Sequence, residues 1–158
     1  MDIVISRASV DDLDKLMAWR MEVLDVVFGI PADADTRELR EANRKYYLEK
    51  LPDEEHIAVF ADVDGTTVGC GGLCLYQEMP SPDNPDGKCA YLMNIYTRKA
   101  YRGQSIGKTI AGWLTKEAER RGISKIYLET SQSGRRMYEG LGFRDMEDYM
   151  KLAEPIDE

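Results

Sequence analysis

The segment Arg98–Lys108 gathers the residue types of an anion-binding loop into eleven consecutive positions. It holds four basic side chains and no acidic one, with glycines at 103 and 107, in a chain of formal net charge -8. An amphipathic pattern typical of a helix follows it. Helix N-termini carry free backbone N–H groups and about half a positive charge from the dipole, so phosphates bind there readily. The alternative is a solvated surface loop; the local charge favours a polyanion site.

Two phosphate-binding motifs compete for the segment 103–109. A nucleotide P-loop needs four residues between its glycines before Lys-Thr, whereas this segment has three. A P-loop also follows its strand closely, whereas Arg98–Arg102 separates the first glycine from the strand that we expect at Ala90–Thr97. The nucleotide interpretation is therefore disfavoured.

The second motif fits better. Arg102-x-x-Ser105-x-Gly107 resembles the Arg/Gln-x-x-Gly-x-Gly/Ala pyrophosphate loop of the GNAT superfamily of acetyltransferases. Met137–Phe143 is similar to the tyrosine-to-Gly-Phe signature of that superfamily. Tyr91–Thr97 is similar to a group of small bacterial members whose substrates are mostly unassigned. The resemblance covers the chain from Ile3 to Leu152.

Two features depart from the superfamily pattern. Ser105 stands where a glycine is usual, and we expect its hydroxyl to cap the helix or touch a phosphate. The asparagine often found before the last helix is not evident, and the candidates to replace it are Ser131, Gln132 and Ser133.

The resemblance implies acetyl coenzyme A as cosubstrate, bound between splayed neighbouring strands, and no metal. The pantetheine is expected to pair like an added strand with the backbone of Ile95, Tyr96 and Thr97, although ordinary sheet pairing could equally occupy these residues. The pyrophosphate is expected on the loop, so the implied cofactor-binding residues there are Arg102, Gly103, Gln104, Ser105, Ile106, Gly107 and Lys108.

Acetyl transfer to an amine needs a neutral nucleophile, a stabilised oxyanion and a proton for the departing thiolate. Backbone N–H groups near Ile95 or Tyr96 could stabilise the oxyanion. The resemblance places Tyr138 beside the sulfur, which makes it the candidate general acid. The ordinary alternative is a half-buried tyrosine that packs under the sheet.

The general base has several candidates. Glu129 ends an expected strand, as the occasional catalytic glutamate of the superfamily does, and burial there would raise its pKa toward working pH. The alternatives are Glu78 and a water chain. His56 has a suitable unperturbed pKa, but a lone histidine before a strand is more often structural or exposed.

The elements that position these residues follow the order β, α, α, β, β, β, α, β, α, β. Ser9 and Asp12 form a capping box for the first helix, Thr36 starts the second, and Asp64-Gly65 closes a hairpin. We expect a mixed α/β fold in which helices cover both faces of a mostly antiparallel sheet with splayed middle strands, all in one domain over 1–158. The expected strands are 3–5, 57–63, 66–75, 90–97, 126–129 and 143–152, and the last helix is 134–141.

Composition limits the partners. An acidic chain with no basic stripe outside the loop argues against nucleic acid, and no window is apolar enough for a membrane span, so we expect a cytoplasmic protein. Three cysteines are too few and too far apart for a disulfide framework, since Cys70 and Cys74 would lie about 13 Å apart in a strand. One histidine rules out the usual Cys/His zinc spacing. The sequence leaves open whether the chain forms a homodimer.

The leading functional hypothesis is an acetyl-CoA-dependent N-acetyltransferase that acts on a small-molecule primary amine or a peptide N-terminus. A non-catalytic coenzyme A-binding sensor is the alternative. We expect Val27–Asp35 and Glu78–Lys88 to shape the acceptor site, and their acidic side chains slightly favour a cationic acceptor.

Overall fold

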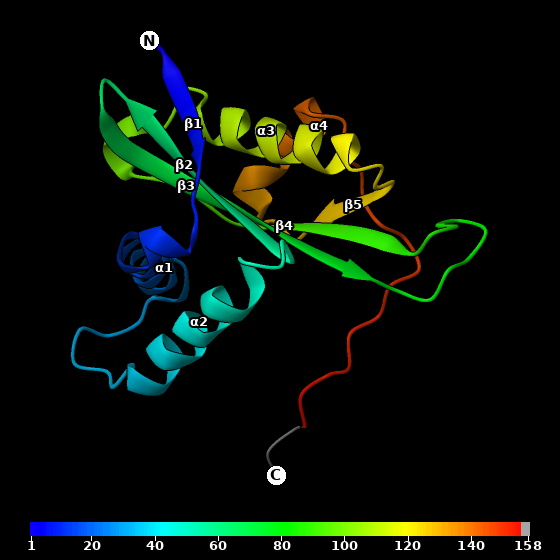
Figure 1. Cartoon of the computed structure of the whole chain (residues 1–158), viewed down its shortest axis with the longest axis horizontal. Helices are drawn as coiled ribbons and strands as arrows, with labels where there is room; N and C mark the ends of the chain where they lie inside the picture. The colour runs from blue at the N-terminus through cyan, green and yellow to red at the C-terminus, as the bar shows by residue number, and fades with distance from the viewer. Residues whose placement is uncertain (156–158) are drawn as a thin grey trace.

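The computed structural model describes residues 1–155, which form a five-stranded sheet with helices on both faces (Figure 1). Neighbouring strands follow one another in chain order, β1 to β4 are antiparallel, and β5 lies parallel to β4. The strands are β1 (Ile3–Arg7), β2 (His56–Val63), β3 (Thr66–Gln77), β4 (Lys88–Thr97) and β5 (Lys125–Leu128). The helices are α1 (Leu13–Phe28), α2 (Arg37–Lys50), α3 (Ile106–Arg120) and α4 (Arg135–Gly140).

The hairpin turn and the helix cap predicted from the sequence are both present. Asp64 and Gly65 both have positive φ, 50° and 78°, as a two-residue hairpin turn requires, and they join β2 to β3. Ser9 and Asp12 form the capping box at a short 3-10 turn that runs directly into α1. The mixed α/β fold predicted from the sequence is confirmed.

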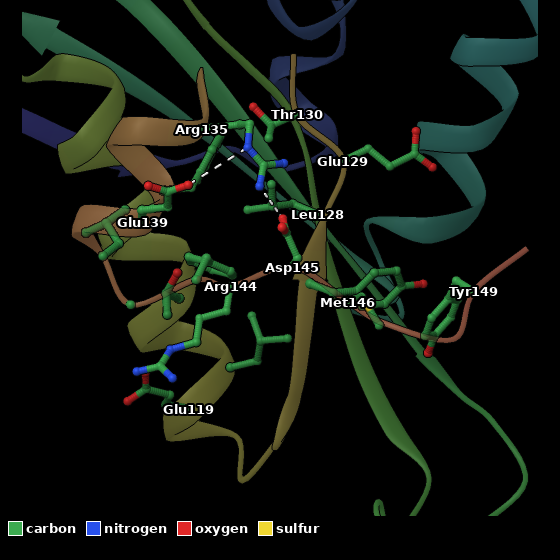
Figure 2. A pocket seen from close by; sticks show the side chains of 17 residues that line it. Glu119, Leu128, Glu129, Thr130, Arg135, Glu139, Arg144, Asp145, Met146 and Tyr149 are labelled. Carbon is green, nitrogen blue, oxygen red and sulfur yellow. Dashed lines mark hydrogen bonds and ion pairs between the residues drawn. The ribbon is translucent and has the colours of Figure 1, made fainter. Parts of the chain in front are cut away.

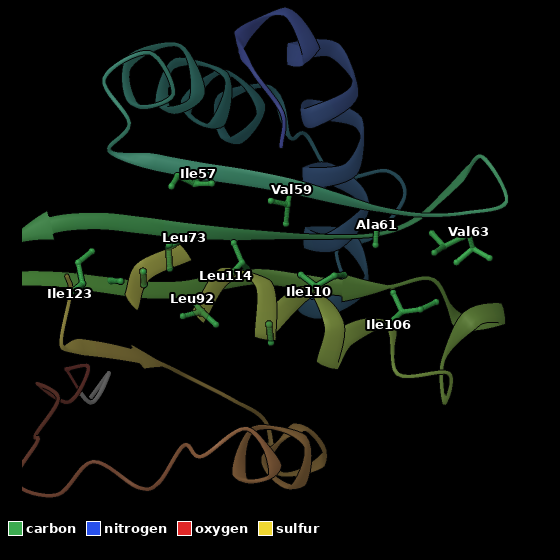
Figure 3. Packing of buried hydrophobic residues seen from close by; sticks show 14 residues of the cluster. Ile57, Val59, Ala61, Val63, Leu73, Leu92, Ile106, Ile110, Leu114 and Ile123 are labelled. Carbon is green, nitrogen blue, oxygen red and sulfur yellow. The ribbon is translucent and has the colours of Figure 1, made fainter. Parts of the chain in front are cut away.

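Two apolar clusters lie on opposite faces of the sheet. One packs α3 against the sheet, with Ile57, Val59 and Leu114 in its centre (Figure 3). The other packs α1 and part of α2 against the opposite face, with Ala58 and Phe60 among its members. Because both faces are covered, β2 is apolar along nearly its whole length rather than alternating.

β4 separates from β5 halfway along its length. The pairing of β4 with β5 ends at Leu92 and Leu128, while β4 continues to Thr97. At the same point β4 carries a bulge opposite β3, where Asn94 has a φ of 58°. The sheet is therefore open on one side of β4 from Met93 to Thr97.

The strand predicted at Phe143–Leu152 is wrong. The chain leaves α4 as an irregular tail that runs away from the sheet, shown in orange and red in Figure 1. The large apolar residues of this tail do not alternate with period two, since Phe143, Met146 and Tyr149 are three residues apart. They cannot share one face of a strand, and Met150 and Leu152 are almost fully exposed.

Candidate active site

The basic loop opens α3 with a run of free backbone donors. The backbone N–H groups of residues 103 to 108 donate to no backbone carbonyl within residues 1–155, and the first such bond in the helix is from Thr109 to Ser105. Gly103 takes a φ of 78° and leaves open space where a Cβ would stand. An anion at this helix terminus would meet several N–H groups at once.

The backbone conformation of Ser105 explains why the superfamily pattern usually has a glycine at this position. Its φ is 65°, in the left-handed region that a residue with a Cβ rarely adopts. Its hydroxyl makes no cap hydrogen bond, so the capping role predicted from the sequence is wrong. The left-handed backbone itself turns the loop into the helix.

One of the four basic side chains is already paired. Arg98 donates to Glu22 at 3.1 Å and 3.2 Å and lies over the Trp19 ring, 4.2 Å from its centroid. Its charge therefore ties β4 to α1 instead of facing a ligand, contrary to the expectation for the loop. Arg102 donates to the Thr97 carbonyl at 3.0 Å and, like Lys99 and Lys108, is exposed.

Gly107 lies where three elements meet. A Cβ built on it would lie 3.3 Å from Met137 Sδ on α4 and 3.7 Å from Thr97 Oγ1 at the end of β4. The loop, the open part of β4 and α4 are therefore adjacent. This is the arrangement that a cofactor running from the loop along β4 requires.

The three β4 residues predicted to hold pantetheine all lie in the open stretch. Ile95 packs into the cluster on the α3 face, and Tyr96 packs into the cluster on the α1 and α2 face. No residue of β5 pairs with Ile95, Tyr96 or Thr97 within the described part of the chain. Their backbone edge on the β5 side is unoccupied by the sheet.

Tyr138 and Glu129 line one cavity of about 550 Å³ between β5, α3, α4 and the C-terminal tail (Figure 2). Burial raises the pKa of Tyr138, so its phenol is held in the protonated form. Its ring meets Phe143 edge-on at 5.9 Å. The loop residues 102–108 do not line this cavity.

The burial expected for Glu129 is absent. Glu129 directly follows β5 and its side chain is exposed. In Figure 2 its carboxylate points away from the ion pair of Arg135 and Asp145, toward the opposite side of β5. Leu128 packs with the α3 face, so alternation along β5 directs Glu129 to the face that carries α1 and α2.

The alternative candidates for the general base, Glu78 and His56, are less suitable than Glu129. Glu78 pairs with Lys125 at 2.8 Å, and this hydrogen bond lowers the pKa of Glu78, which makes it a weaker base. His56 is buried, with 3% of its surface exposed, and its Nδ1 lies 2.7 Å from the Tyr46 hydroxyl. Burial, together with the charge of Arg20, lowers the pKa of His56 to about 4.

A second cavity of about 270 Å³, next to His56, was missed by sequence reasoning. It lies between the sheet and the helices α1 and α2, and neither Val27–Asp35 nor Glu78–Lys88 contributes to it. The one indication of this cavity in the sequence was Asn94, because asparagine is uncommon within a strand. The other residues that line the cavity come from distant parts of the chain.

The buried His56 predicts an acid-sensitive fold. An unfolded histidine titrates near pH 6.5 and the folded one near 4, so the unfolded state binds more protons between these values. The free energy of unfolding should therefore fall by about 2 kcal/mol from pH 7 to pH 5, above the main carboxyl titrations. Urea unfolding at several pH values measures it. A His56→Gln variant should lose most of this dependence, and an unchanged slope in the variant would contradict the assignment.

Residues 1–155 offer neither a metal-binding cluster nor a membrane-spanning helix. Within residues 1–155, no group of three or more His, Cys, Asp or Glu side chains is arranged to hold a metal ion. The helices of this part of the chain include none with the length and apolarity needed to cross a membrane. Cys70, Cys74 and Cys89 are free thiols.

Comparison with known proteins agrees with this geometry. The model of the acetyltransferase (GNAT) family matches residues 14–143. A predicted acetyltransferase from Clostridium acetobutylicum, solved with acetyl-CoA, is 25% identical over 96% of each chain, with a TM-score of 0.83. A GCN5-related N-acetyltransferase from Ralstonia eutropha is 21% identical, with 98% of this chain and 99% of that chain covered and a TM-score of 0.78. A glucosamine-6-phosphate N-acetyltransferase from Arabidopsis thaliana is 16% identical, with a TM-score of 0.70 and coverage of 99% and 100%.

A comparison with curated proteins gave no significant match. The fold and the family model together define an acetyltransferase. The chain belongs to the acetyltransferase (GNAT) family, and the resemblance found in the sequence is confirmed.

Proposed function

We propose that the protein is an N-acetyltransferase that moves the acetyl group of acetyl-CoA to a primary amine by direct attack. The observation that carries the proposal is the row of free N–H groups at 103 to 108, which stands at the end of an open strand edge. The Clostridium acetobutylicum neighbour, which shares this fold, was solved with acetyl-CoA. The three free thiols fit a reducing compartment such as the cytoplasm.

The open edge gives the cofactor a direction. With its pyrophosphate on Gly103–Lys108, the pantetheine extends along β4 from Thr97 toward Leu92, because β5 leaves this end of β4 free. The sheet closes again at Leu92 and Leu128. The thioester therefore stops near Met93–Ile95, and N–H groups there are candidates to bind the oxyanion.

Two side chains are proposed to act at that position. Tyr138 comes from α4 on the α3 side of the sheet, and its raised pKa keeps the proton that the departing thiolate needs. Glu129 follows the last β5 residue paired with β4 and faces the α1 and α2 side. In the proposed reaction Glu129 takes the proton of the attacking amine, directly or through a water, and Tyr138 protonates the sulfur.

A coenzyme A-binding sensor is the second candidate function. It would use the same loop and strand edge, but it would not turn over. The Tyr138 hydroxyl has no hydrogen-bond partner among the described residues. None of the described polar side-chain atoms is both buried and unpartnered, so this hydroxyl faces accessible space. A hydroxyl that is free to donate its proton favours the enzyme over the sensor.

The test of the proposal combines binding and turnover. Acetyl-CoA at a hundredfold excess over its Kd should stabilise the fold by about 2.7 kcal/mol, read as a rise in melting temperature. Free thiol should be released from acetyl-CoA across a panel of primary amines. Stabilisation without thiol release on any amine would favour the sensor, and stabilisation by ATP with magnesium instead of acetyl-CoA would overturn the cofactor.

A further inference from the structure

The second cavity adjoins the point where the proposed thioester stops. Met93 and Asn94 line it from β4, and they are the first residues beyond the last pair between β4 and β5. The bulge at Asn94 turns both side chains to the face that carries α1 and α2. The other residues that line the cavity are Arg20, Ala42, Asn43, Tyr46, Tyr47, His56 and Cys74.

Arg20 is the central polar group of this cavity. Its Nε donates to Asn43 Oδ1 at 2.9 Å, and its Nη1 donates to Asn94 Oδ1 at 2.9 Å. Two neutral amides therefore hold the guanidinium in place. Arg20 makes no ion pair with any carboxylate in residues 1–155, although salt bridges are frequent elsewhere on the surface.

The remaining donors of Arg20 make no hydrogen bond to the protein in residues 1–155. A guanidinium has five N–H groups, and the two bonds to asparagines use two of them. Among the described residues no buried side-chain nitrogen lacks a partner, so the unbonded Nη2 is not enclosed by protein. Nη2 is therefore accessible, on a side chain that lines the cavity.

Arg20 is also the one charged side chain among the residues that line this cavity at neutral pH. His56 is neutral there, because burial holds its pKa near 4. Burial likewise raises the pKa of the Cys74 thiol and of the two tyrosines, so these groups are uncharged. A small, half-enclosed cavity with a single fixed cation is complementary to a monoanion.

We infer that this cavity binds the acetyl acceptor and that Arg20 holds its carboxylate, so that the acceptor is a small amino acid. The inference rests on the proposed acetyl transfer and adds the class of acceptor. The sequence favoured a cationic acceptor because of the acidic residues in two loops. Those loops do not line the cavity, so the inference of an amino acid takes the place of that expectation.

The short distance between the anion site and the reaction centre restricts the acceptor further. Arg20 bonds directly to Asn94, the bulge residue beside the thioester position. The amine and the carboxylate must therefore be only a few bonds apart, as in an α- or β-amino acid. The cavity of about 270 Å³ is also smaller than the range of about 300–1,000 Å³ common for drug-sized ligands.

The reaction balances without a further reactant. The amine nitrogen forms a bond to the acetyl carbon and the carbon–sulfur bond breaks, which yields an N-acetylamino acid and free coenzyme A thiol. The amine gives one proton to Glu129 or its water, and the sulfur receives one from Tyr138. Arg20 keeps its charge and acts only on the carboxylate.

The experiment compares free amino acids with their α-carboxamides and with the matching decarboxylated amines. The wild-type protein should use at least one amino acid with a kcat/KM that exceeds that of its amide by roughly 10- to 100-fold, the value of one charge-assisted pair. Replacing the carboxylate by an amide lowers the pKa of the amine, which favours the amide chemically and makes the expected preference harder to obtain by accident. Equal use of acid and amide would overturn the inference.

Variants separate recognition from folding. Arg20→Gln should raise KM for the amino acid about 10- to 100-fold with little change in kcat, and should leave kcat/KM for the amide nearly unchanged, so that the preference disappears. Arg20→Lys keeps the charge and should fall between the two. Arg40→Gln is the matched control, because Arg40 is exposed on α2 and does not line the cavity. An equal loss on acid and amide in Arg20→Gln would mean that Arg20 only supports the structure.

A binding measurement keeps the inference independent of turnover. The α-hydroxy acid that corresponds to the best amino acid has the carboxylate but no amine, so it should bind the complex with coenzyme A and raise its melting temperature. Arg20→Gln should abolish this shift and Arg40→Gln should retain it. If no amine is acetylated while the hydroxy acid still binds through Arg20, the proposed activity fails and the anion site stands. If amines are acetylated and the hydroxy acid does not bind, the anion site fails alone.

Discussion

A Tyr138→Phe variant is expected to lose turnover by roughly 10²- to 10⁴-fold while its affinity for acetyl-CoA persists, since this is the usual contribution of a general acid. Phenylalanine keeps the ring, its packing and its edge-on contact with Phe143. It removes only the hydroxyl, which is the one proton that this side chain can give. Thiol release on an identified acceptor measures the rate, and calorimetry measures the affinity.

The matched control for this variant is Tyr149→Phe. Tyr149 lines the same cavity as Tyr138, but it lies on the tail and is exposed. Its loss of a hydroxyl should leave turnover unchanged. Wild-type turnover in Tyr138→Phe would show that Tyr138 is only a packing residue and that water protonates the thiolate.

Short-range patterns predicted most of the fold. The hairpin at Asp64-Gly65 and the capping box at Ser9 depend on residues no more than four positions apart, and both are present. The basic loop followed by a helix was likewise predicted from adjacent residues, and α3 begins there at Ile106. Such features need no knowledge of the rest of the molecule.

Features that depend on distant partners were not readable. The sequence placed Arg98 in the anion site, but Arg98 forms an ion pair with Glu22, which lies 76 residues away. The cavity at Arg20 forms only when α1, α2 and β4 come together. The expected burial of Glu129 failed for the same reason, since the residues that could cover the end of β5 lie in other elements.

The tail shows a different limit. Phe143–Leu152 contains enough apolar residues to suggest a strand. In a strand, however, Phe143 and Tyr149 would lie on one face and Met146, Met150 and Leu152 on the other, so there is no single apolar face. Pairing also needs a receptive edge, and β5 is only four residues long. Composition favoured a strand at this position, and the spacing of the apolar residues decided against it.

The open strand edge is the feature that connects the fold to the proposed chemistry. A bulge at Asn94 and the end of pairing at Leu92 occur at the same level of the sheet. The loop lies at one end of this opening, and Glu129 and the Arg20 cavity lie near the other. In the proposed reaction, cofactor and acceptor therefore approach one position from opposite ends without passing each other.

A Gly107→Val variant is expected to weaken acetyl-CoA binding about 100-fold, as for the loss of two charge-assisted hydrogen bonds at about 1.5 kcal/mol each. Gly107 lies in the first turn of α3 among the free N–H groups, and a Cβ there already comes within 3.3 Å of Met137 Sδ and 3.7 Å of Thr97 Oγ1. A branched side chain must push α4 and the end of β4 apart or project over the donors, and either displacement spoils the pyrophosphate site.

The control for Gly107→Val comes from the same helix. Gly112 lies on α3, and a Cβ there would make only an ordinary contact of 3.8 Å with Leu141. Gly112→Ala should therefore stabilise the fold by about 0.5–1 kcal/mol through helix propensity and leave the Kd for acetyl-CoA unchanged. Calorimetry on both variants, after circular dichroism shows that each is folded, gives the comparison. If Gly107→Val is folded and binds acetyl-CoA as tightly as Gly112→Ala does, the pyrophosphate does not rest on this loop and the cofactor must enter the open edge of β4 from another direction.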